Sequence, residues 1–127
     1  MSNENDVIGC CIWSIAEGYI PSQSTGNGRE FESHESACLL NAGGAHAEVE
    51  ITVFFDDRDP VGPYQVIVPA MRTLHLRFND LEDPEPIPRD TPYAAVIESD
   101  EPIVVQHTRM DTRQAALGLA STVAHPD

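Results

Sequence analysis

The sequence contains 127 residues, of which 41% are hydrophobic, and it carries a formal net charge of −14 at pH 7. This length fits one domain, and no apolar run approaches the ~20 residues that a membrane-spanning helix requires. The 21 acidic residues outnumber the seven arginines, and lysine is absent, which disfavours general binding to nucleic acid or anionic lipid. DNA binding would require the arginines to gather into one patch. Because salt screens the repulsion between the carboxylates, we expect thermal stability to rise between low and molar potassium chloride.

The ends of the chain and its cysteines indicate the cellular compartment. Residues 1–6 are polar and acidic, and we expect a disordered tail there, followed by a single β-sandwich domain at residues 7–127. The tail lacks the basic region of a signal peptide, so we expect a cytoplasmic protein. Cys10, Cys11 and Cys38 lack the spacing of a disulfide framework or a zinc site, which predicts buried free thiols.

Short alternations of apolar and polar residues predict strands. The clearest is residues 45–55, where the apolar positions alternate with polar ones, as in an antiparallel strand with one face in the core. Charged turns are expected at residues 56–63 and 98–101, and four prolines exclude a long helix from residues 79–92. The predicted strands are residues 7–16, 32–41, 45–55, 64–68, 71–78, 93–97, 102–109 and 119–124.

This spacing of strands and turns, with no convincing helix, favours an all-β fold: an antiparallel β-sandwich or jelly-roll of seven or eight strands. Residues 10–16 and 36–42 are apolar on both strand faces. Because one sandwich core covers one face of each strand, a subunit interface is expected over part of the other. The sequence therefore predicts a symmetric homo-oligomer.

Recognisable catalytic and metal-binding motifs are absent from the sequence. The five histidines show no H-x-H or H-E-x-x-H spacing, there is no G-x-S-x-G turn, and Gly26-Asn27-Gly28 is too short for a phosphate loop. We therefore expect no catalytic residue, metal site or cofactor, and no enzymatic activity. The histidines with suggestive neighbours are those in His34-Glu35 and His107-x-Arg109-x-Asp111.

Residues 103–109 begin apolar and end polar. One face of this predicted strand carries Ile103, Val105, His107 and Arg109 in order, because successive side chains alternate between faces. We therefore expect the strand to start in the core and end at a rim of the sandwich.

Residues 11–19 show the same change from apolar side chains at the start of a strand to polar side chains at its end. Cys11, Trp13, Ile15 and Glu17 share one predicted face, and Tyr19 follows the strand. If the two strand ends meet at one rim, Glu17 pairs with an arginine of the other strand, beside its histidine. Such a pair is equally compatible with a structural salt bridge, worth ~0–1 kcal/mol, and with a binding site. An aromatic ring beside carboxylate, arginine and amide groups also suits a sugar or another small polar ligand. Trp13 is most simply a core residue.

Several segments resemble the sensory rhodopsin transducer family. They occur in order from residue 13 to about residue 114 and together cover most of the chain. The resembling segments are Trp13-Ser14-Ile15-Ala16-Glu17-Gly18-Tyr19-Ile20-Pro21, Ser33-His34-Glu35, Cys38-Leu39-Leu40-Asn41, Asp57-Arg58-x-Pro60-Val61-Gly62-Pro63-Tyr64, Arg77-Phe78-Asn79-Asp80-Leu81, Val96-Ile97-Glu98-Ser99-Asp100 and Pro102-Ile103-Val104-Val105-Gln106-His107-Thr108-Arg109.

The resemblance implies a small cytoplasmic β-sandwich that assembles as a homotetramer and relays a light signal from the cytoplasmic side of a sensory rhodopsin. The retinal would belong to that membrane partner, to which the protein would be peripheral. The leading hypothesis is therefore a non-enzymatic signalling adaptor, and the alternative is a carbohydrate or small-polar-ligand binding module of the same fold. The candidate ligand- or partner-binding residues are Trp13, Glu17, Tyr19, His34, Glu35, Arg77, Asn79, His107 and Arg109.

Overall fold

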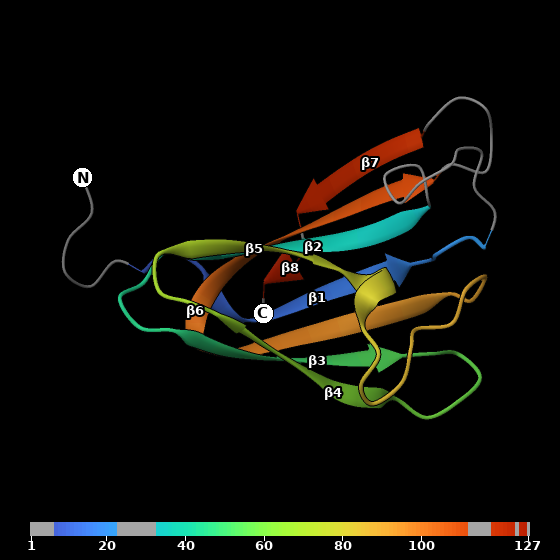
Figure 1. The fold of residues 1–127 in the computed structure, drawn as a ribbon, viewed down its shortest axis with the longest axis horizontal. Coiled ribbons are helices and arrows are strands. Elements are labelled where there is room, and N and C mark those ends of the chain that lie inside the picture. Colours follow the sequence, from blue (N-terminus) through green and yellow to red (C-terminus); the bar gives the residue numbers. More distant parts are fainter. Residues whose placement is uncertain (1–6, 23–32, 112–117, 124, 127) are drawn as a thin grey trace.

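The computed structural model describes residues 7–22, 33–111, 118–123 and 125–126, which form an all-β fold of antiparallel strands (Figure 1). The one described helix is a single 3-10 turn. The predicted tail at residues 1–6 and the segment Gly26-Asn27-Gly28 lie outside the described residues. The described elements are β1 (Cys10–Gly18), β2 (His34–Asn41), β3 (Ala47–Phe54), β4 (Val61–Val68), β5 (Arg72–Arg77), the 3-10 helix η2 (Phe78–Asp80), β6 (Tyr93–Asp111), β7 (Gly118–Val123) and β8 (His125–Pro126).

Two antiparallel sheets share β6. Sheet A has the strand order β4-β3-β6-β1-β8, and in sheet B strands β5, β2, β6 and β7 lie side by side in that order. The first half of β6 pairs with β1 and β3, and its second half pairs with β2 and β7. In Figure 1, β6 runs beside β3, curls at the left end of the molecule and returns beside β2. This one strand therefore connects the two halves of the fold.

The continuity of β6 corrects the prediction of a turn at residues 98–101. The backbone there stays paired, since Glu98 lies opposite both Ile12 and Glu50, and Ser99 lies opposite Val49. The composition of this acidic segment favours a turn, but the cross-strand hydrogen bonds keep it extended. The predicted strands 93–97 and 102–109 are therefore one strand.

Two irregularities in β1 alter which side chains face the core. The register with β6 shifts between Cys10 and Ile12 and again between Ile15 and Gly18. A bulge adds a residue and so reverses the alternation beyond it. Trp13 and Ile15 are buried as predicted, whereas Cys11 and Glu17, predicted on the same face, are exposed. The prediction of a buried thiol is therefore wrong for Cys11; all three cysteines are free.

Three element boundaries also differ from the predictions. β4 begins at Val61, inside the predicted turn, because the backbone opposite Val53 continues the pairing. Phe78 leaves β5 and begins η2 with its ring fully buried. His125 lies beyond the last predicted strand and pairs with Ser14 in β8.

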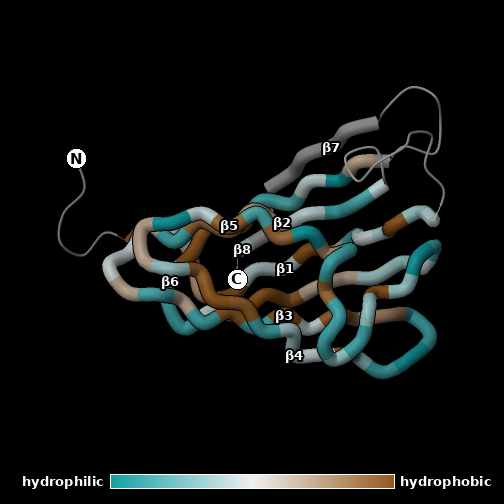
Figure 2. Tube along the Cα trace, in the orientation of Figure 1, coloured by the Kyte–Doolittle hydropathy of each residue, from teal (hydrophilic) through white to brown (hydrophobic). Residues whose placement is uncertain are grey.

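The core lies between the sheets and draws on every sheet strand from β1 to β6. In Figure 2 hydrophobic stretches concentrate toward the middle of the molecule, and the connecting segments at its right-hand end are mainly hydrophilic. Trp13 is 5% exposed, and its indole N–H donates to the carbonyls of Cys10 and Ile103, both at 3.0 Å. The fully buried aliphatic and aromatic residues include Ile20, Leu39, Ile51, Val53, Val68, Phe78, Ile97, Ile103 and Val105. Across the described residues no helix has the length and apolar character needed to cross a bilayer.

Candidate functional site around Glu35

A fully buried carboxylate lies at one end of the sandwich. Glu35 stands on the core-facing side of β2, one position into the strand, and its exposed fraction is 0%. Removing a carboxylate from water is costly unless charged or hydrogen-bonding groups replace the water. The surroundings of Glu35 therefore determine whether this end of the sandwich is stable.

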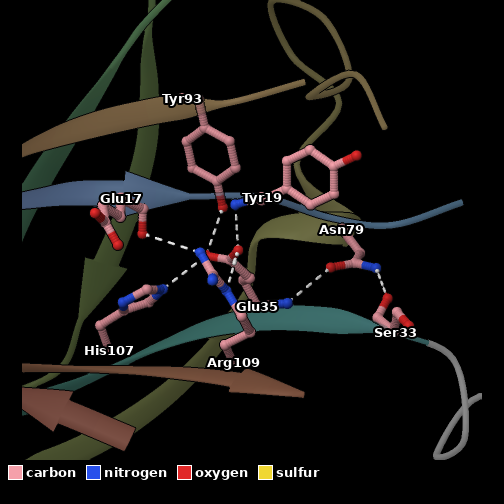
Figure 3. Close-up of polar contacts among 8 residues, drawn as sticks. All are labelled: Glu17, Tyr19, Ser33, Glu35, Asn79, Tyr93, His107 and Arg109. Atoms are coloured by element: carbon pink, nitrogen blue, oxygen red, sulfur yellow. Dashed lines mark hydrogen bonds and ion pairs between the residues drawn. The ribbon is translucent and has the colours of Figure 1, made fainter. Parts of the chain in front are cut away.

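Each carboxylate oxygen of Glu35 contacts two groups (Figure 3). His107 Nε2 lies 2.7 Å from Oε1, and the Tyr93 hydroxyl donates to the same oxygen at 3.2 Å. Arg109 Nε donates to Oε2 at 3.0 Å, and the backbone N–H of Tyr19 donates to Oε2 as well. One cationic guanidinium and three further donors thus replace the water around this carboxylate.

Strand β6 supplies three of these donors, and Tyr19, directly after β1, supplies the fourth. His107 and Arg109 share a face of β6 and lie opposite Ala37 and Glu35 in the register with β2. Tyr93 comes from the other end of β6. The 16 residue-to-residue steps from Tyr93 to Arg109 would span about 50 Å in a straight strand, yet both residues reach the same carboxylate because β6 curls between the sheets.

A glycine makes room for the tyrosine. A Cβ atom at Gly18 would lie 2.4 Å from the Tyr93 ring, so the ring occupies space that any other residue at this position would need. The ring also packs edge-on against Phe78, with centroids 5.9 Å apart and planes at 69°. Gly18 and Phe78 thereby fix the direction of the Tyr93 hydroxyl toward Glu35.

The Tyr93 hydroxyl is held in its protonated form. Burial raises its pKa, and the negative charge of Glu35 raises it further, as does the hydrogen bond that the hydroxyl donates to that carboxylate. Tyr93 is only 3% exposed. It therefore acts as a hydrogen-bond donor to Glu35 throughout the physiological pH range.

A second set of contacts ties β2 to η2. The backbone N–H of Glu35 donates to Asn79 Oδ1 at 3.2 Å, and Asn79 Nδ2 donates to the carbonyl of Ser33 at 3.0 Å. One amide side chain thus satisfies two backbone groups on either side of His34. His34 itself alternates to the opposite face of β2, where Arg77 Nη2 lies 2.7 Å from its Nδ1.

Comparison with known proteins identifies the family. The model of the Anabaena sensory rhodopsin transducer family matches residues 8–126. The chain belongs to this family. A solved structure of the Anabaena sensory rhodopsin transducer is 60% identical in sequence, with a TM-score of 0.71 over 79% of this chain and 97% of that one. The crystal structure of Thermotoga maritima 1070 is 34% identical, with a TM-score of 0.84 over 94% of this chain and 96% of that one. No curated protein is significantly similar.

Within this transducer fold, most of the predicted site residues do meet. Glu35, His107 and Arg109 form the centre, with Tyr19 contributing its backbone N–H and Asn79 joining through the backbone of Glu35. His34 and Arg77 form a separate pair on the other face of β2. Trp13 is packed in the core, where it holds the first bulge of β1.

The partner of Arg109 differs from the predicted one. Its Nε pairs with the carboxylate of Glu35, and its Nη2 contacts only the backbone carbonyl of Glu17, at 3.4 Å. The second bulge of β1 is the reason, because it directs the Glu17 side chain to solvent. Since the carboxylate involved is fully buried, the pair is not the exposed salt bridge that the sequence suggested.

The sequence did not predict that Tyr93 and Ser33 contribute to the contacts around Glu35. Tyr93 follows Pro92 at the start of a predicted strand, and only the curl of β6 brings it to Glu35. Ser33 contributes a backbone carbonyl, for which no side-chain pattern exists. Among the described residues, no three His, Cys, Asp or Glu side chains gather in a metal-binding arrangement.

Proposed function

We propose that this protein is a non-enzymatic signalling adaptor that relays a light signal from a sensory rhodopsin in the membrane to cytoplasmic targets. The observation that carries the proposal is the 60% sequence identity with the Anabaena sensory rhodopsin transducer, across 97% of that chain. The family match over residues 8–126 extends the similarity to nearly the whole sequence.

The residues that contact Glu35 are Tyr19, Asn79, Tyr93, His107 and Arg109, and together with Glu35 they form the Glu35 cluster. This cluster favours a role in signal transmission over a role in catalysis. All of its polar groups named above are directed at one another, and they join the end of β1, the start of β2, η2 and both ends of β6. A displacement at any of these elements would alter contacts at the others, which is what coupling between two surfaces requires. The cluster is therefore proposed to couple movements of these elements to one another within the adaptor.

The adaptor is further proposed to be a homotetramer. Several large apolar side chains remain exposed on the isolated chain, and soluble proteins commonly bury such groups at subunit interfaces. Light scattering at micromolar protein in physiological salt is expected to give four times the mass of one chain, and a monomer would contradict the assembly. The exposed apolar side chains assigned to this interface are Val7, Ile8, Leu40, Phe54 and Met71.

Binding of a sugar or another small polar ligand at this cluster is the less favoured function. Such a ligand needs convergent polar groups that it can reach. Glu35 and His107 are buried, with exposed fractions of 0% and 6%, and they contact each other.

The test combines the purified chain with Anabaena sensory rhodopsin in lipid nanodiscs. Saturable binding by calorimetry is expected, together with a change in the rate of the rhodopsin photocycle when the chain is added. Empty nanodiscs and nanodiscs with a light-driven proton pump serve as controls. Absence of binding to the sensory rhodopsin, or equal binding to all three, would overturn the proposed function.

A further inference from the structure

The solvent-facing side of sheet A combines carboxylates with exposed apolar side chains. In the register of its strands, Gln65, Glu50, Glu98 and Ile12 lie in one row across β4, β3, β6 and β1. In the neighbouring row Ile67 lies opposite Glu48. All six are exposed, whereas the residues between them along the strands, such as Val49 and Ile97, face the core. We call these six residues the outer face of sheet A.

The charges of this face have one sign. Glu50 lies directly opposite Glu98, and like charges in that arrangement repel each other. Strands β1, β3, β4 and β8 and residues 93–101 of β6 contain neither lysine nor arginine. Among the described residues, sheet A therefore supplies no permanent cation of its own to offset these carboxylates.

The same face has a shape and an apolar component suited to a peptide. A groove of about 490 Å³ runs over β3 and β4, with Glu48 and Glu50 along one strand and Gln65 and Ile67 along the other. Ile67 is 59% exposed and Ile12 is 40% exposed. Apolar side chains beside carboxylates would accept a segment that carries both apolar and cationic residues.

We propose that the outer face of sheet A docks a lysine- and arginine-rich segment containing apolar residues, supplied by the cytoplasmic side of the membrane partner. This inference rests on the proposed function. Cytoplasmic loops of membrane proteins carry an excess of lysine and arginine, so the charge of the partner is complementary to that of this face. The docked cations would also relieve the repulsion between Glu50 and Glu98.

The experiment compares two charge-neutralised variants of the full chain. The first is Glu48→Gln, Glu50→Gln and Glu98→Gln together. The matched control removes three exposed carboxylates elsewhere, by Asp56→Asn, Asp59→Asn and Glu82→Gln. Each is titrated with Anabaena sensory rhodopsin in nanodiscs and, separately, with an amidated 15-residue peptide of alternating arginine-rich and leucine-rich positions. Circular dichroism melts verify folding, and Glu98→Gln alone replaces the triple variant should that variant not fold.

The wild-type chain is expected to bind both probes, more weakly at 0.5 M than at 0.05 M potassium chloride. The outer-face variant should lose about tenfold in affinity for each probe, and the control should lose much less. Equal losses in the two variants would mean that only the overall charge matters, and would overturn the proposal. Rhodopsin binding that the outer-face variant retains would overturn it too, while leaving the proposed function intact. If the wild type binds the peptide but not the rhodopsin, the proposed function fails and the assignment to a membrane partner fails with it. Failure of the wild type to bind the peptide would overturn the proposal that the outer face of sheet A docks a cationic segment.

Discussion

Glu35 and Glu98 are both strand carboxylates, but their surroundings are opposite. Glu35 is fully buried between the sheets and contacts an arginine, a histidine, a tyrosine hydroxyl and a backbone N–H. Glu98 is exposed on sheet A and lies opposite another carboxylate, Glu50. One charge is therefore compensated within the fold, and the other remains available to a partner. This contrast separates a carboxylate that stabilises the fold from one that faces solvent, and four substitutions test it.

The largest effect is expected from Glu35→Ala. Removing the carboxylate leaves Arg109 and His107 without their buried acceptor, and breaking a buried ion pair in this way typically costs ~3–5 kcal/mol. Urea denaturation of the variant and the wild type measures the loss in unfolding free energy. A loss below about 1 kcal/mol would show that the contacts of the Glu35 carboxylate contribute little to the stability of the fold.

A smaller loss is expected from Gly18→Ala. The added methyl group would lie 2.4 Å from the Tyr93 ring, and overpacking of this kind costs ~1–3 kcal/mol. Gly44→Ala is the matched control, because a Cβ atom there meets nothing within 4 Å. Thermal melts should separate the two variants, and equal melting temperatures would contradict the tight packing of Tyr93.

Tyr93→Phe removes one donor to Glu35 and should cost about 1 kcal/mol at neutral pH. It should also change the response to alkali. Since the pKa of Tyr93 is raised from 10.0 in the folded protein, the folded state keeps its proton where the unfolded state loses it. Its stabilising contribution is complete below pH 10 and declines above that pH. Stability measured from pH 9 to 11.5 should therefore fall more steeply in the wild type than in Tyr93→Phe.

Glu98→Gln should produce the smallest effect, with the opposite sign. Relief of the repulsion from Glu50 should stabilise the chain by ~0.2–1 kcal/mol at low salt, and the gain should shrink in molar potassium chloride. Glu82→Gln, in an exposed loop, provides the comparison. A loss of stability in Glu98→Gln would mean that its carboxylate is engaged within the fold, as that of Glu35 is.

Local patterns predicted much of this structure. Residues 47–54 alternate between buried and exposed as the sequence indicated, and His107 and Arg109 do lie on one face at the end of a strand. The family resemblance, quoted on segments from Trp13 to Arg109, is confirmed by the match over residues 8–126. The strand patterns depend on neighbouring residues alone, and the family resemblance depends on short segments that recur in order along the chain.

The errors arise where distant pairing overrides that local information. The bulges of β1 depend on its register with β6, and they move Glu17 out of the cluster that its spacing from Trp13 predicted. Glu98 and Ser99 stay extended because Glu98 pairs with both β1 and β3 and Ser99 pairs with β3. Tyr93 reaches Glu35 only because β6 curls. None of these effects has a signal in composition or periodicity.

The position of Trp13 gives the protein an intrinsic optical probe. It is the single tryptophan of the chain, and its indole N–H contacts the carbonyls of Cys10 and Ile103 at the point where β6 passes from one sheet to the other. The emission of a buried, hydrogen-bonded indole changes in wavelength and intensity when its surroundings rearrange. Unlabelled protein could therefore report, by its own fluorescence, whether binding at either end of β6 alters the curl of that strand.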